Sequence, residues 1–414
     1  MKRIHSAWLL LLLVSTGYAM SIFQRYYPST LAPDLRAAFD LDAVSFSLIS
    51  SATMLGYAIT QIPSGIFADV FGGRRTLAVY QTLAGVFGIV FAFSDSFSSA
   101  VACRFLIGLT LASNVPSYKI LALAVPAHRF ALCSSILSAF GRFGSLLAAA
   151  PLIALTQMTG WRMVLACAGI FTVGLGVSVW LFVPDLDRLR SGAREGSSLR
   201  ERILAVKDGI RMALRNRNFW LILIWFNFII GNGYIMGTTW WGSFFMQAHS
   251  LSKESTGLAL SLFALIPLPF MLVFPWLSQT VLRSRKKLLI LVAAGQLCVS
   301  CVFCLCRETA LSFPVLTGFG ALFGLLASCS VPIAFTMVKE SVASSVQATA
   351  TAVVNSGAPV FAAVMQGVFG VILKAGMERG ARPLEAYADA FLLIAAGAGI
   401  ALVCAVFMKD TFSK

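Results

Sequence analysis

Long apolar runs separated by short polar loops make up most of this chain. A helix needs about 20 apolar residues to cross a membrane, and twelve stretches of suitable length follow one another. The pattern predicts an all-α polytopic membrane protein with twelve transmembrane helices. The expected spans are residues 7–33, 43–68, 76–94, 98–125, 131–158, 161–183, 219–246, 256–279, 287–305, 310–338, 344–374 and 386–408.

One longer polar segment divides the twelve stretches into six and six. We therefore expect an N-terminal six-helix bundle over 1–183, a cytoplasmic linker over 184–218 and a C-terminal six-helix bundle over 219–414. Within the linker, apolar residues recur at helical spacing, which predicts an amphipathic helix lying on the membrane surface. Its apolar face consists of Leu199, Ile203, Val206, Ile210 and Leu214, and its basic anchors are Arg200, Arg202, Lys207, Arg211 and Arg215.

The two halves resemble each other weakly. Pro116 and Pro332 have similar neighbours, in Asn-Val-Pro and Ser-Val-Pro, and the same offset pairs Gly141 with Gly357. Two related six-helix halves are typical of transporters with a central site. The halves are therefore predicted to form two pseudo-symmetric bundles.

Charge is scarce and unevenly distributed. Only 12% of residues are charged, yet the net charge is +15. The basic residues gather in alternate short loops, which indicates membrane topology rather than nucleic-acid binding and predicts that both termini are cytoplasmic. Short termini and the absence of an Asn-x-Ser/Thr sequon favour a bacterial inner (plasma) membrane. We expect a monomer in contact with the lipid bilayer.

Enzymatic chemistry has no sequence signature here. Four of the nine cysteines fall in one predicted helix, where cysteine is interpreted as a small hydrophobe rather than as a metal ligand. The sequence contains no Walker loop and no recognisable pair of nucleophile and base. We therefore expect a carrier without a metal or cofactor. The four clustered cysteines are Cys298, Cys301, Cys304 and Cys306.

Two arginines interrupt the apolar runs. Arg142 lies near the middle of the stretch 131–158, and Arg25 follows the apolar run that begins at Ala7. An arginine at bilayer depth costs several kcal/mol, so it usually faces a water-filled path or a partner. With few carboxylates inside the spans, an anionic substrate is the partner we expect.

The loop after the second span carries a family motif. It reads Gly65-Ile-Phe-Ala-Asp69-Val-Phe-Gly72-Gly73-Arg74-Arg75. This resembles the signature loop of the major facilitator superfamily, with Val70 where that family usually has a basic residue. The resemblance implies the major facilitator fold and a gating role for Gly65, Asp69, Gly72, Arg74 and Arg75. A second copy, from Pro275 to Lys286, lacks the acidic residue.

A narrower resemblance covers mainly the N-terminal half. Gly17-Tyr-Ala, Arg25, Leu31-Ala-Pro-Asp-Leu and Gly56-Tyr57-Ala with Gln61-Ile-Pro look like the organic-anion branch of that superfamily, which includes glycerol-phosphate, hexonate and vesicular glutamate carriers. The resemblance implies that Arg25 binds the substrate anion. The candidate substrate-binding residues are Arg25, Tyr57, Gln61, Arg104, Lys119, Arg142, Asn232, Tyr234, Trp241 and Asn355.

Several candidates have a second interpretation. Arg25 could snorkel to the outer interface, Lys119 to the inner one, and Arg104 could anchor hydrogen bonds within the bundle. Trp240 and Trp241 could form an interfacial belt instead of lining the path. Gly231 and Gly233 are expected to loosen the seventh span.

Coupling to protons through the groups usual in this branch is not expected. Gln24 and Leu111 occupy positions where proton-coupled members carry carboxylates, and neither side chain can bind a proton. The favoured function is exchange or uniport of a small organic anion, a carboxylate or an organophosphate, by alternating access. The alternatives are an exporter of drug-like or siderophore-like molecules and, less favoured, a carrier-like sensor.

Overall fold

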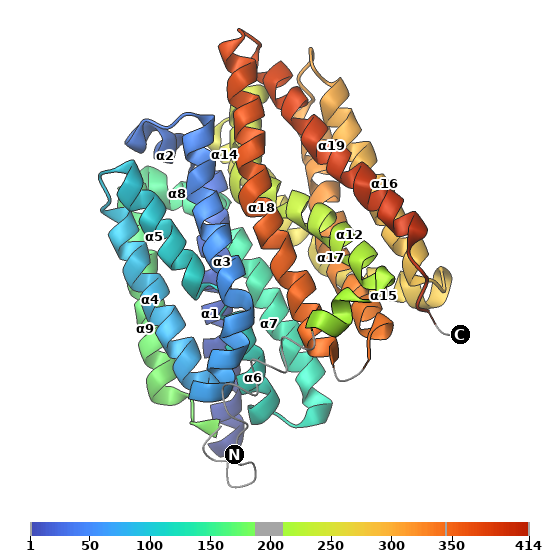
Figure 1. Ribbon diagram of the computed structural model, residues 1–414. Coiled ribbons are helices and arrows are strands. Elements are labelled where there is room, and N and C mark those ends of the chain that lie inside the picture. Colours follow the sequence, from blue (N-terminus) through green and yellow to red (C-terminus); the bar gives the residue numbers. More distant parts are fainter. Residues whose placement is uncertain (1, 187–209, 344–345, 413–414) are drawn as a thin grey trace. The chain divides into compact units, whose positions relative to one another are not determined.

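The computed structural model describes residues 2–186, 210–343 and 346–412, apart from the side chains of residues 2–7, 127, 128, 131 and 348 (Figure 1). These ranges form helices and contain no strand. The helices are α1 Lys2–Thr30, α2 Ala32–Phe39, α3 Ala43–Phe71, α4 Gly73–Ala92, α5 Phe97–Thr110, α6 Asn114–Ala124, α7 Ala127–Leu147, α8 Ala150–Thr159, α9 Trp161–Phe182, α12 Arg217–Ile235, α13 Trp241–Ser243, α14 Lys253–Leu265, α15 Pro267–Trp276, α16 Arg285–Leu305, α17 Phe313–Ser341, α18 Gln347–Glu378 and α19 Pro383–Phe407.

The helices confirm the predicted membrane architecture. Ten are long and apolar enough to cross a membrane, and α7 with α8 forms one further span bent by 43°. The 29-residue helix α1 precedes these spans in the described part of the chain. The all-α polytopic prediction is therefore confirmed.

The chain packs as two compact units. The first consists of Met1–Tyr27 and Ala52–Leu204, and the second of Pro28–Ser51 and Ala205–Lys414. The predicted amphipathic linker helix falls largely on residues 187–209, outside the described ranges; residues 210–214 are helical.

Several predicted spans are interrupted, among them the fourth and the seventh. The fourth breaks between α5 and α6, where Pro116 lacks the amide hydrogen needed to continue a helix from the preceding turn. The seventh contains two π-helical turns, η2 Met236–Trp240 and η3 Phe244–Ala248, on either side of α13. Helix α12 stays regular through Gly231 and Gly233, and the irregular part of this span begins after them, at Met236.

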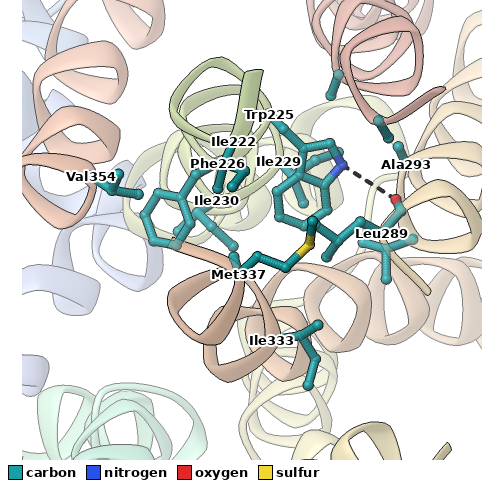
Figure 2. Packing of buried hydrophobic residues seen from close by; sticks show 14 of the residues in the cluster. Ile222, Trp225, Phe226, Ile229, Ile230, Leu289, Ala293, Ile333, Met337 and Val354 are labelled. Carbon is teal, nitrogen blue, oxygen red and sulfur yellow. Dashed lines mark hydrogen bonds between the residues drawn. The ribbon is translucent and has the colours of Figure 1, made fainter. Parts of the chain in front are cut away.

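A buried cluster holds α12, α16 and α17 together in the second unit. Figure 2 shows Trp225 pointing towards Leu289, whose carbonyl accepts the indole N–H at 3.2 Å. Nearby, Asn232 donates to Gln296 at 3.3 Å and to the carbonyl of Ile394 at 3.1 Å. Hydrogen bonds between helices satisfy polar groups that lipid could not.

The segment Pro28–Ser51 packs with the second unit through polar contacts. Lys253 Nζ lies 2.8 Å from an Asp34 carboxylate oxygen, and Lys374 Nζ lies 2.7 Å from Asp42. The amide of Gly242 donates to Ser29 Oγ at 3.0 Å. Two ion pairs, to α14 and α18, and one hydrogen bond, from α13, therefore hold this segment in the second unit.

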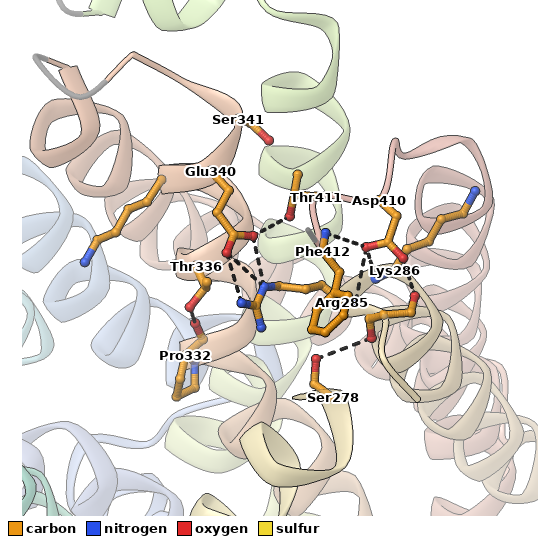
Figure 3. Close-up of polar contacts among 12 residues, drawn as sticks. Ser278, Arg285, Lys286, Pro332, Thr336, Glu340, Ser341, Asp410, Thr411 and Phe412 are labelled. Atoms are coloured by element: carbon orange, nitrogen blue, oxygen red, sulfur yellow. Dashed lines mark hydrogen bonds and ion pairs between the residues drawn. The ribbon is translucent and has the colours of Figure 1, made fainter. Parts of the chain in front are cut away.

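The second motif copy, from Pro275 to Lys286, lacks an acidic residue of its own, but its Arg285 pairs with an acidic residue of α17. Arg285 donates to Glu340 of α17 from Nε at 2.9 Å and from Nη2 at 2.9 Å, and Thr411 donates to Glu340 at 2.6 Å (Figure 3). Asp410 accepts from Ser284 Oγ and, at 3.2 Å, from the amide of Arg285. Asp410 thereby caps the start of α16, where a negative charge is favoured.

Replacing Asp410 with alanine should lower the free energy of unfolding by about 1 kcal/mol, as loss of a helix cap does. Burial disfavours the charged form of Asp410, but hydrogen bonds from Ser284 and backbone amides outweigh it and lower its pKa. The stabilisation is thus complete above the ordinary carboxyl pKa of about 4 and is lost as the pH falls through the lowered value. Thermal melts of Asp410→Ala and Asp410→Asn from pH 3 to 8 test this. If the difference in melting temperature between wild type and Asp410→Ala increased as the pH falls, this prediction would be wrong.

Candidate functional site

Arg25 lies inside the first unit, on α1. Its side chain is 2% exposed, and Nε donates to the carbonyl of Ser21 at 3.4 Å. The guanidinium carbon lies 4.5 Å from the centre of the Tyr57 ring, which α3 contributes. Gln61, one turn further along α3, is 5% exposed. Burial and the aromatic contact argue against snorkelling to the interface.

Arg142 is half-buried on α7 at a point where this helix closely approaches α1. A Cβ added at Gly144 would overlap the carbonyl oxygen of Ala19, and one at Gly141 would lie 2.6 Å from Cε1 of Tyr18. The two glycines therefore allow α7 to lie directly on α1. This contact holds the backbone of Arg142 beside Tyr18.

Tyr18 belongs to this cluster, although the sequence predictions did not include it. Its phenol interacts electrostatically with Arg25, Arg142, Tyr57 and Tyr118. Two turns separate Tyr18 from Arg25, so both lie on one face of α1. That spacing was available in the sequence, but nothing in it indicated that α7 would bring Arg142 to the same face.

Hydroxyl groups surround this cluster. Tyr118 and Ser138 share a hydrogen bond of 3.1 Å between α6 and α7, and Ser21 and Ser113 share one of 2.6 Å. The first unit thus gathers two guanidiniums, several phenols and serine hydroxyls from α1, α3, α6 and α7. Such groups can donate charge-assisted hydrogen bonds to an anion.

Arg104 is part of the packing between α5 and α1. It is 0% exposed and donates from Nη1 to the carbonyl of Gln24 at 2.8 Å. Its guanidinium lies 4.8 Å from the centre of the Tyr27 ring and 5.9 Å from that of Phe91. This geometry matches the anchoring interpretation of Arg104.

Lys119 contacts the motif loop. Its Nζ lies 3.1 Å from Asp69 and donates to the carbonyl of Ala68 at 2.6 Å. These contacts hold the end of α3 against α6. Gly65 lies near, because its Cβ would come 3.9 Å from Val115 of α6.

The basic end of the loop contacts α9 and the residues after it. Arg74 and Arg75 lie 3.8 and 3.9 Å from Asp185, and Arg74 donates to the carbonyl of Val183 at 3.3 Å. Gly72 has a φ of 89°, a conformation that glycine adopts readily. The loop therefore ties three helices of the first unit together.

The candidates of the second unit differ in their surroundings. Asn232 is 1% exposed and takes part in the hydrogen bonds between α12, α16 and α19. Trp241 is 3% exposed and stacks on Phe245 at 5.4 Å, within a larger cluster of aromatic rings. Tyr234 on α12 and Asn355 on α18 are half-buried.

The interfacial-belt interpretation of Trp240 and Trp241 is wrong. Trp240 is 0% exposed and packs against Phe46 and Phe369, so neither indole lies at the lipid-facing surface. In the described ranges, no group of three or more His, Cys, Asp or Glu residues could hold a metal ion.

A model of the Major Facilitator Superfamily matches residues 14–309 and 241–413. The chain belongs to this superfamily. Its members are transporters, so the protein is a multi-pass membrane transporter and not an enzyme. The predicted resemblance to this superfamily and the helical membrane fold are thus confirmed.

Curated relatives of this superfamily member are about a quarter identical to it over the aligned residues. An uncharacterized transporter of Bacillus subtilis is 26% identical over 67% of this chain and 63% of its own length. A probable sulfoacetate transporter of Cupriavidus necator is 24% identical over 64% and 63%. The chain thus matches less than two thirds of the length of these two. A gallate transporter of Pseudomonas putida is 23% identical over 73% and 72%.

Solved structures share the fold at lower identity. A bacterial homolog of the human lysosomal transporter Spinster has a TM-score of 0.77 at 16% identity, covering 97% of this chain and 96% of its own. A D-xylose-proton symporter has a TM-score of 0.75 at 15% identity, covering 98% and 97%. These structures support the fold of this family member.

Proposed function

We propose that this protein is a secondary carrier for a small organic anion, a carboxylate or an organophosphate, and works by alternating access. The supporting observation is the arrangement of Arg25 and Arg142 around Tyr18 in the first unit. Two cations in a region of low dielectric favour a negatively charged ligand. Relatives named for sulfoacetate and gallate, both organic anions, point the same way.

The remaining candidates take different roles in this proposal. In the first unit, Tyr18, Tyr57 and Gln61 contact substrate beside the two arginines. In the second unit, Tyr234 and Asn355 remain candidate substrate-binding residues. Arg104 acts as a positioning residue, because its hydrogen bond to Gln24 holds α1 next to the binding residues. Asn232 and Trp241 stabilise the helices of the second unit through hydrogen bonds and ring packing.

The gating residues are Gly65, Asp69, Gly72, Arg74 and Arg75, and we add Lys119 because it binds Asp69. The glutamine at position 24 and the leucine at 111 favour exchange or uniport over proton symport. We place the protein as a monomer in a bacterial inner membrane with both termini cytoplasmic. An exporter of drug-like molecules is the second candidate, and the dense ring packing around Trp241 gives it less support.

A thermal-shift panel on the purified protein tests this function. Mono- and dicarboxylates, sulfonates and sugar phosphates are each compared with a neutral amide or sugar of similar size. A ligand at 100 times its Kd stabilises the folded state by about 2.7 kcal/mol, so we expect at least one anion class, and no neutral analogue, to raise the melting temperature. Stabilisation by neutral or cationic drug-like compounds alone would overturn the anion proposal and favour the exporter.

A further inference from the structure

Helices α4 and α9 pack side by side in the first unit (Figure 1). A groove runs between them. Its volume is about 270 Å³. Apolar atoms provide almost all of its surface. It is lined by Val79, Thr82 and Leu83 of α4 and by Gly176, Val177 and Trp180 of α9.

The groove opens towards the membrane. Trp180 is 48% exposed, Val177 is 47% exposed and Val79 is 49% exposed, although all three are apolar. In a protein that crosses the bilayer, such side chains face acyl chains. At Gly176 the two helices approach so closely that a Cβ would overlap Thr82 Oγ1, so Gly176 and Thr82 line the groove where α9 contacts α4.

One end of the groove is basic. Arg75 lies one helical turn before Val79 on the same face of α4, and Arg74 places its guanidinium carbon 5.4 Å from the centre of the Trp180 ring. The side chains of Arg74 and Arg75 are 22% and 37% exposed. Asp185 pairs with both arginines and balances one of the two charges, so these three described residues carry a net charge of +1.

We propose that the groove binds one acyl chain of an anionic phospholipid, with the phosphate held by Arg75 and Arg74. The distance along α4 from Arg75 to Leu83 is about 12 Å at 1.5 Å per residue. One leaflet contributes about half of a hydrocarbon core about 30 Å thick, so the groove spans most of one leaflet. A tryptophan near the headgroup level suits Trp180, because amphipathic rings favour the interface. The net positive charge selects an anionic over a zwitterionic headgroup.

This site is separate from the proposed substrate cluster, and its ligand is a component of the bilayer rather than cargo. The phosphate would share Arg74 and Arg75 with Asp185. Lipid binding would therefore act on the same loop that we propose as a gate.

Fluorescence quenching by brominated lipids tests the site on the purified full-length chain. Phosphatidylglycerol and phosphatidylcholine, both with brominated acyl chains, are titrated in detergent, and the Trp180 signal is the difference between wild type and Trp180→Phe. We expect phosphatidylglycerol to quench Trp180 at lower concentration than phosphatidylcholine. Arg75→Gln should weaken phosphatidylglycerol binding about fivefold, the effect of one basic residue near an anionic surface.

Matched variants separate the groove from general effects. Arg129→Gln removes an exposed arginine of α7 and should leave the Trp180 signal unchanged. Val177→Phe fills the groove and should reduce quenching, whereas Ile170→Phe changes another lipid-facing residue of α9, 62% exposed, and should not. Equal quenching by the two lipids, or a full preference for phosphatidylglycerol in Arg75→Gln, would overturn the proposal. Equal quenching in Val177→Phe and Ile170→Phe would also overturn it.

Discussion

Arg25→Gln and Arg142→Gln should each lower the transport rate at subsaturating substrate by at least about 30-fold. Truncating one partner of a buried charge pair costs about 2–5 kcal/mol, and a bound anion would lose that partner in either variant. Initial rates of uptake into proteoliposomes, with an anion identified by thermal shift, measure the effect. The same anion should no longer stabilise either variant.

Conservative variants make this prediction specific. Arg25→Lys keeps the charge but not the planar, two-pronged donor, so it should retain part of the activity. Arg129→Gln removes an exposed arginine of α7 and should transport at the wild-type rate. If Arg25→Gln and Arg142→Gln remain folded and transport normally, the arginine cluster is not the substrate site.

Gly144→Ala should destabilise the protein by about 1–3 kcal/mol or more, as overpacking of a tight contact does. The added methyl group would overlap the carbonyl oxygen of Ala19, so α7 must move away from α1. The shift would also separate Arg142 from Tyr18 and weaken anion binding in the protein that does fold. Melting temperature and ligand-induced shift, measured on one preparation, report both effects.

Gly174→Ala is the matched control. Nothing lies within 4 Å of a Cβ at this position of α9. Alanine is favoured over glycine in a helix by about 1 kcal/mol, so this variant should be as stable as wild type or slightly more stable. A Gly144→Ala protein with unchanged melting temperature would show that the approach of α7 to α1 is looser than the structure describes.

The order and type of the helices followed from local chemistry. A span of about 20 apolar residues has no other stable arrangement in lipid, because each backbone amide must bond within its own segment. The signature loop at Gly65–Arg75 could also be recognised from the sequence, because the residues of the motif lie close together in the chain. Helix breaks were less predictable: the π-helical turns on either side of Trp241 depend on packing against surrounding rings.

The sequence by itself determined that this chain spans the membrane with helices and carries two arginines within or next to its apolar runs, because hydrophobicity and charge act residue by residue. Only the tertiary structure decided how those charges are used. Two glycines let α7 lie on α1, which places the backbone of Arg142 beside Tyr18. Lys119 binds Asp69 because α6 packs beside the end of α3. Asp410 caps α16 although the residues lie far apart in the chain. Contacts of this kind depend on which helix faces pack together, and no local pattern encodes that choice.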